Sequence, residues 1–285
     1  MNNKITPKRK RQIKEVTRGT IQLLFFIFLP SAFTSAFSAI KYIFTQLNLK
    51  APIELTSFVT ILIVLCLFTI VFGRFFCGFA CAFGTLGDAV HGIYVKICKK
   101  VKRKPLKLNQ TIGKFLSAIK YLILTAIILL CFSGVYSKIT GWSPWDVFSM
   151  IRAGNFKLTA YIVGVIILAL LLVGMTLFER FFCRFFCPLG AIFSLLPILP
   201  FFSLHRNTEN CLKGCSACKN NCPADIALDN KNGCPNGNCF QCQKCTNICP
   251  KKNISTNFSK LKGNEIWFTL LRAALLAAVL VWAGV

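Results

Sequence analysis

Acidic residues and histidines are scarce in this 285-residue chain, which has nine Asp and Glu against 34 Lys and Arg, and two histidines. No Cys-x-x-Cys-His motif occurs, and two histidines cannot supply the axial ligands of several haems. We therefore expect no c-type haem. Only 15% of the residues are charged and 55% are hydrophobic, which is too apolar for an ordinary soluble domain. The composition indicates a membrane protein.

Positive residues lie between long apolar runs instead of on one soluble face, so we expect membrane lipid, and not nucleic acid, as a partner. Four charge-free runs approach the ~20 residues that a helix needs to cross a bilayer. They are Ile21–Ile40, Leu55–Gly73, Tyr121–Ser137 and Leu158–Phe178. A fifth span is expected at 265–285, although Arg272 interrupts it and the abrupt apolar end leaves open whether the chain continues. The prediction is an α-helical integral membrane protein with four spans and a fifth at the end.

Orientation follows from the positive residues near the span ends, which are retained on the cytoplasmic side. Seven Lys and Arg precede the first run in the basic segment 1–20, and eight lie between residues 96 and 114. Both segments are therefore predicted to be cytoplasmic, and alternation then places everything from Cys183 onward there as well. The expected location is the cytoplasmic (inner) membrane, crossed several times. A cleavable signal peptide is the alternative interpretation of the first apolar run.

An internal repeat lies within the predicted membrane domain, 21–204. Segments 72–84 and 178–190 share eight of thirteen residues at an offset of 106 positions. Each copy carries two cysteines four residues apart, which predicts that both thiols share one helical face. The four are Cys77, Cys81, Cys183 and Cys187. Because both copies end a span on the same side, the four thiols can converge on one shared metal site.

The chemistry of these four cysteines fits a metal centre, because four thiolates are what a [4Fe–4S] cluster or a zinc ion requires. Arg74 and Arg180, which lie beside the pairs, should make a thiolate easier to form. Two alternatives stay open. The cysteines could be packing residues at aromatic-rich helix ends, or pairs that exchange disulfides.

The segment 205–262 carries two cysteine runs of the bacterial ferredoxin type, each ending in Cys-Pro. The downstream run is Cys239-x2-Cys242-x2-Cys245-x3-Cys249 and the upstream run is Cys211-x3-Cys215-x2-Cys218-x3-Cys222. In such runs the fourth cysteine binds the other cluster of a two-cluster domain. The sequence thus predicts a small cytoplasmic ferredoxin-like α+β domain with two [4Fe–4S] clusters.

The ligands of these two clusters follow from that exchange of the fourth cysteine. The first cluster is assigned Cys211, Cys215, Cys218 and Cys249, and the second Cys239, Cys242, Cys245 and Cys222. Cys234 is surplus, and it could replace Cys239 or stay free. A structural zinc module is the competing interpretation, whereas disulfides are disfavoured in a reducing cytoplasm.

These motifs resemble those of membrane-bound polyferredoxins of the NapH and NosR type, over roughly residues 21–252. The Cys183-x3-Cys187-Pro188 motif matches the family pattern, and the first copy matches except for Ala82 in place of proline. The resemblance implies electron transfer between a membrane quinol pool, cytoplasmic clusters and a partner redox or maturation system. The flavin-attachment motif of some relatives is absent, so we expect no covalent flavin.

The predicted function is that of a membrane-bound electron-transfer subunit with two [4Fe–4S] clusters and a further Fe–S cluster at the repeat ends. Its expected partners are quinol and a redox protein that the sequence does not identify. A redox sensor or assembly scaffold, and a thiol–disulfide conduit, are the alternatives. No catalytic base or nucleophile set is evident, so we do not expect an autonomous enzyme.

Overall fold

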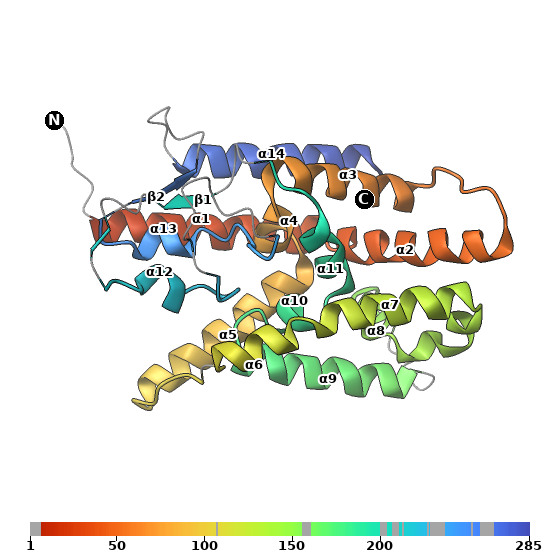
Figure 1. The fold of residues 1–285 in the computed structure, drawn as a ribbon, viewed down its shortest axis with the longest axis horizontal. Helices are drawn as coiled ribbons and strands as arrows, with labels where there is room; N and C mark the ends of the chain where they lie inside the picture. Colours follow the sequence, from red (N-terminus) through yellow and green to blue (C-terminus); the bar gives the residue numbers. More distant parts are fainter. Residues whose placement is uncertain are drawn as a thin grey trace.

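A computed structural model describes residues 7–106, 108–155, 161–199, 204–206, 211–212, 214–226, 228, 237–251, 253–256 and 265–285. The described part is helical except for two short strands (Figure 1). Its first half contains α1 Pro7–Phe28, α2 Ala32–Leu49, α3 Ser57–Phe72, α4 Phe75–Phe79, α5 Ala82–Lys100, α6 Gln110–Leu116 and α7 Ile119–Phe132. Its second half contains the 3-10 helix η1 Val135–Trp142, then α8 Pro144–Arg152, α9 Ile162–Leu177, α10 Phe181–Phe185, α11 Pro188–Leu195, β1 Leu204–Arg206, α12 Ala217–Asn220, α13 Lys244–Ile248, β2 Ile254–Thr256 and α14 Glu265–Trp282.

The first predicted span, Ile21–Ile40, is not one straight helix. Helix α1 ends at Phe28, α2 begins at Ala32, and their axes differ by 58°. The break contains Pro30, which has no backbone N–H to donate and whose ring clashes with the preceding helical turn. The apolar run was correctly recognised, but its proline divides it.

The predicted number of spans was also wrong. Two helical stretches in the described ranges are long and apolar enough to cross a membrane. They are Thr111–Phe132, which runs through α6 and α7, and Glu265–Trp282, which is α14. The bent pair α1–α2 would make a third span. Helices α3 and α9 have 16 residues each. At 1.5 Å per residue they are about 24 Å long, short of the ~30 Å hydrocarbon core. The apolar helices nonetheless indicate a membrane protein.

The ferredoxin-like α+β domain predicted for 205–262 is a second correction. Its described residues contain the short helices α12 and α13 and one antiparallel pair of three-residue strands, in which His205 faces Ser255. A ferredoxin-like sheet is not seen in this part of the chain. Cys218 and Cys245 lie in these short helices, so the closely spaced cysteine runs leave few described residues for extended strands.

The cysteine-rich segment lies at one end of the molecule, beside the N-terminal half of α1 (Figure 1). Helix α5 runs toward the same end, whereas α2 and α7 extend to the opposite end. The basic N-terminal residues, the basic end of α5 and the cysteine-rich segment are therefore on one side.

The core around the repeat is built from aromatic rings. Phe33, Phe83 and Phe182 are fully buried and pack on one another, with ring centroids 4.9 to 6.1 Å apart. Phe182 directly precedes Cys183 in one repeat copy, and Phe83 directly follows Ala82 in the other. Their burial holds both repeat copies in one apolar environment, where polar groups need partners.

Candidate metal centres

Each repeat copy folds as a short helix, a break and a second helix. Cys77 lies in α4 and Cys81 directly precedes α5, while Cys183 lies in α10 and Cys187 directly precedes α11. Cys81 and Cys187 are extended, with ψ angles of 124° and 112°. The prediction that each pair shares one helical face was therefore wrong, because the helix breaks between the two cysteines.

The four repeat cysteines nevertheless converge. All four are buried, and burial raises the pKa of Cys81 and Cys187 well above the usual range. Neighbouring thiolates of Cys183 and Cys77 raise both pKa values further, which requires the thiols to lie within electrostatic reach of one another. The convergence follows from the packing of α5 against α9 and α10.

Each arginine of the repeat packs against the glycine of the other copy. The guanidinium of Arg180 occupies the space over Gly84, and a Cβ there would collide with it and lie 2.8 Å from the Cys77 carbonyl oxygen. Arg74 does the same at Gly190, where a Cβ would be 2.7 Å from its Nη2. Both repeated glycines therefore make room for the arginine of the other copy, and this interlock accounts for their identity.

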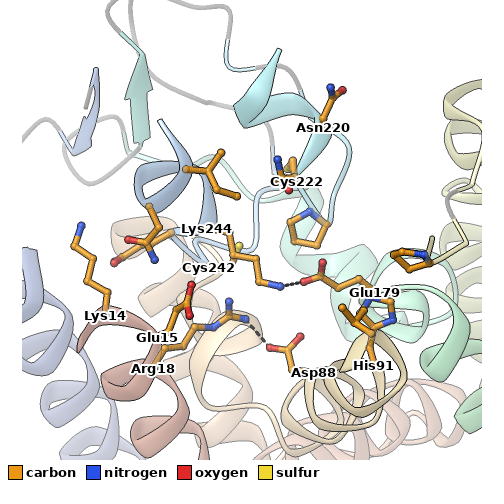
Figure 2. A pocket seen from close by; sticks show the side chains of 18 of the residues that line it. Lys14, Glu15, Arg18, Asp88, His91, Glu179, Asn220, Cys222, Cys242 and Lys244 are labelled. Atoms are coloured by element: carbon orange, nitrogen blue, oxygen red, sulfur yellow. Dashed lines mark hydrogen bonds and ion pairs between the residues drawn. The ribbon is translucent and has the colours of Figure 1, made fainter. Parts of the chain in front are cut away.

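Asp88 neutralises Arg180. Its carboxylate accepts hydrogen bonds from Arg180 Nε at 2.8 Å and Nη2 at 2.6 Å, and it pairs with Arg18 at 2.5 Å (Figure 2). Burial raises the pKa of Asp88, but Arg180 and then Arg18 outweigh it and hold the pKa well below its usual range. Arg180 in turn donates to the Cys77 and Gly78 carbonyls. Asp88 thus fixes the backbone that carries Cys77.

Arg74 is buried without such a carboxylate. Its side chain is 1% exposed, it donates to the Gly237 carbonyl at 3.3 Å, and Nη2 lies 3.9 Å from Cys77 Sγ. Its Nε has no hydrogen-bond partner among the described residues. The position that corresponds to Asp88 in the second copy is Ser194, which cannot carry negative charge.

Lys120 is a second buried cation at the same place. It is 1% exposed, and its Nζ donates to Asn238 Oδ1 at 2.5 Å. It is close enough to Cys187 and Cys77 to interact with them electrostatically. Lys120 was not among the predicted site residues, because the predicted span began one residue later, although a lone lysine in an apolar helix is itself a signal of function.

The arginines do not make the thiols acidic. Burial raises the pKa of Cys183 to about 11, although Arg180 and Arg74 lower it. The arginines thus favour the thiolate of Cys183, as expected, but burial outweighs their effect in the protein alone. Thiols of this kind lose their protons when a metal binds them.

A second group of cysteines lines a small cavity in the cysteine-rich segment. Four of its lining residues are the predicted ligands of the second cluster, Cys222, Cys239, Cys242 and Cys245. Cys218 and apolar side chains such as Leu204 and Ile226 complete the wall. Burial raises the pKa of Cys245 well above its usual range, and Cys242 and Cys222 raise it further. Cysteines of both ferredoxin runs therefore line one cavity.

The predicted ligands of the first cluster are less fully assembled. Cys218 and Cys249 pack on one small apolar core with Leu204 and Ile254. Cys211 Sγ accepts a hydrogen bond from Arg206 at 3.1 Å. Cys215 lies just before α12, and Cys234 lies outside the described ranges.

The described residues contain no disulfide and no group of three His, Cys, Asp or Glu side chains close enough to hold a single metal ion. A [4Fe–4S] cluster attaches each thiolate to a different iron, so its ligands stand farther apart than those of one ion. Cluster ligation by these cysteines stays a prediction.

The two cysteine groups are joined by a segment, Gly237–Cys242, that is docked on the repeat. Both arginines lie over the Phe240 ring, with Arg74 at 4.9 Å and Arg180 at 5.9 Å from its centroid. Gly78, next to Cys77, meets the Phe240 carbonyl so closely that a Cβ could not be accommodated. The Cys242 backbone N lies beside the same glycine, 3.6 Å from that Cβ position, so this segment brings Cys242 close to the repeat.

Replacing Gly78 by alanine should undock this segment and destabilise the protein by about 1–3 kcal/mol, the usual effect of overpacking. The measurement is denaturant unfolding in detergent, together with protease cleavage within 237–242. Gly92→Ala is the matched control, because nothing lies within 4 Å of the added Cβ. Equal stability and equal cleavage of the two variants would contradict the docking.

Comparisons with known proteins bear first on the repeat. A family model described as a 4Fe–4S binding domain matches residues 55–105 and 161–200. One stretch contains Cys77 and Cys81, and the other contains Cys183 and Cys187. Together with the relatives below, this match supports a polyferredoxin-like family of 4Fe–4S proteins. The match ends before Cys211, so it supports iron–sulfur binding but not a number of clusters.

Three relatives extend this likeness. An uncharacterized protein of Methanocaldococcus jannaschii is 28% identical over 88% of the chain and 97% of its own length. A second from that organism is 30% identical, with 64% of each chain covered. The putative electron transport protein YccM of Escherichia coli is 26% identical over 68% of the chain and 54% of its own length. No solved structure matches the chain.

Proposed function

We propose that this protein is a membrane-bound electron-transfer subunit, in which a [4Fe–4S] cluster at the repeat ends exchanges electrons with two clusters in the cysteine-rich segment. The observation that carries the proposal is the pair of buried cations, Arg74 and Lys120, beside the four buried repeat thiols. The name of YccM, a putative electron transport protein, supports the same role.

The charge at the repeat ends supports a cluster there. Neither Arg74 nor Lys120 has an ion-pair partner among the described residues, and an uncompensated buried charge is costly. An oxidised [4Fe–4S] core held by four thiolates is a dianion, whose charge would match these two cations. Cys77, Cys81, Cys183 and Cys187 would hold the cluster. Arg180, already paired with Asp88, would position the backbone of Cys77.

Electron transfer between the two regions would use the docked segment. Arg180 lies close enough to both Cys183 and Cys242 to interact electrostatically with each of them. The buried Phe240 ring lies against both Arg74 and Arg180. We therefore infer that electrons pass along this contact, and that the chain positions and tunes clusters without bond-making chemistry of its own.

Orientation and external partners complete the proposal. The basic start of α1, the basic end of α5 and the cysteine-rich segment lie at one end of the molecule (Figure 1). Positive charge of this kind is retained in the cytoplasm, so we place the cysteine-rich segment there in a multi-pass protein. The membrane quinol pool or a cytoplasmic donor would supply electrons to a partner redox or maturation system.

Iron content tests the proposal. Anaerobically purified protein should hold about twelve iron atoms, and Cys77→Ser and Cys183→Ser should each lose about four, because each single variant breaks the same four-thiolate cluster. The reduced protein should show the EPR signal of cubanes. The control is Cys66→Ser, which changes a cysteine in α3 outside both motifs and should leave iron unchanged.

Other outcomes would reject parts of the proposal separately. Unchanged iron in both repeat variants would reject the shared cluster and favour packing or dithiol exchange, which a disulfide within each pair would identify. Stoichiometric zinc with little iron would reject electron transfer altogether.

A further inference from the structure

A cleft of about 670 Å³, lined by many charged side chains, opens between α1, α5, the short helices α12 and α13 and the start of α14. Cys222 and Cys242 both line it, one from each ferredoxin run (Figure 2). They are also two of the four cysteines around the predicted second cluster. Through this cleft, solvent and partners can approach that group of cysteines.

The carboxylates of the cleft are all paired with basic side chains that also line it. Five acidic side chains line it, and each forms an ion pair with a basic side chain of the cleft. The pairs are Glu15–Arg11, Glu265–Lys14, Asp88–Arg18, Asp225–Arg184 and Glu179–Lys244. Figure 2 shows two of them, Asp88–Arg18 and Glu179–Lys244, beneath Cys242.

Three lysines of the cleft have no carboxylate partner among the described residues. Lys96 and Lys99 are exposed on α5, and Lys219 is half-buried on α12. No carboxylate of the described residues lies within ion-pairing distance of any of the three. The cleft therefore presents a positive rim around the approach to Cys222 and Cys242.

We propose that this cleft is the docking site of an acidic protein electron carrier. The inference rests on the proposed electron-transfer function and names the partner's surface chemistry. Unpaired lysines beside an open cleft suit a small, transient redox interface, in which complementary charge steers the encounter. A protein fits better than a small anion, because the lysines are divided between α5 and α12 and line an open cleft.

The test uses the full chain in neutral-lipid nanodiscs and follows its reduction by an acidic ferredoxin in stopped flow. Wild-type rates should fall steeply with salt, since steering is screened. The triple variant Lys96→Gln, Lys99→Gln, Lys219→Gln should react about tenfold more slowly at low salt, with a shallower salt dependence. The matched control is Lys50→Gln, Lys100→Gln, Lys104→Gln, which removes the same charge from exposed lysines outside the cleft.

A cationic reductant, reduced methyl viologen, separates the two levels of the proposal. If it reduces wild type and variant alike while only the ferredoxin rate depends on the triple, the docking site is supported. Docking is overturned if viologen reduces the protein but the ferredoxin rate is the same in wild type and the triple variant. It is also overturned if that rate falls equally in the control variant. If viologen reduces no cluster, the proposed function fails instead.

Two further results would also overturn the inference. Saturable inhibition by inorganic phosphate at constant ionic strength, abolished in the triple variant, would assign the lysines to a small-anion site. An effect of the triple variant that occurs only in nanodiscs with anionic lipid would assign them to the membrane surface.

Discussion

Replacing Asp88 by asparagine is expected to lower the free energy of unfolding by about 3–5 kcal/mol, because it leaves a buried guanidinium without its counter-charge. The Arg180 side chain is 0% exposed and Asp88 is 14% exposed. The variant would also place the positive charges of Arg180 and Arg18 against a neutral amide.

Denaturant unfolding in detergent measures this effect, and Glu15→Gln provides the control. Glu15 pairs with Arg11 four residues earlier on α1, and both side chains are more than half exposed. Such surface pairs contribute under about 0.5 kcal/mol. An Asp88→Asn variant as stable as Glu15→Gln would show that Arg180 does not depend on this carboxylate.

The repeat and its cysteines could be predicted from the sequence, because equal spacing in two copies implies equal local structure. The convergence of Cys77, Cys81, Cys183 and Cys187 follows from that symmetry. What breaks the symmetry could not be predicted. Asp88 has a serine as its counterpart, so one repeat arginine is neutralised and the other is not.

The wrong predictions about the membrane helices have a common cause. Counting charge-free residues measures hydrophobicity but not where a helix ends, and breaks at Pro30 and before the cysteine motifs shortened the helices. The same counting hid Lys120, since the span was started beyond it. Contacts between distant segments, such as Phe240 with Arg74 and Arg180, have no local signal in the sequence.

The last prediction concerns Arg74, whose replacement by methionine should change stability in opposite directions with and without the cluster. In the loaded protein Arg74 would face an anionic cluster, and its removal should cost about 3 kcal/mol, as for a broken buried pair. In the Cys77→Ser, Cys183→Ser background, which should lack the cluster, Arg74 is a buried cation with no carboxylate. There its removal should stabilise the fold by about 1–4 kcal/mol, since a methionine of similar length carries no desolvation penalty.

Unfolding of all four proteins in one detergent gives both effects and their difference, which measures the coupling between Arg74 and the cluster. Arg152→Met is the control, because Arg152 is exposed on α8 and its effect should be small and equal in both backgrounds. A change of sign between backgrounds can arise only if the partner of Arg74 is lost with the repeat cysteines. An effect of the same sign and size in both would mean that Arg74 is stabilised by Gly237 and Phe240 alone, and the charge argument for a cluster at the repeat ends would then fail.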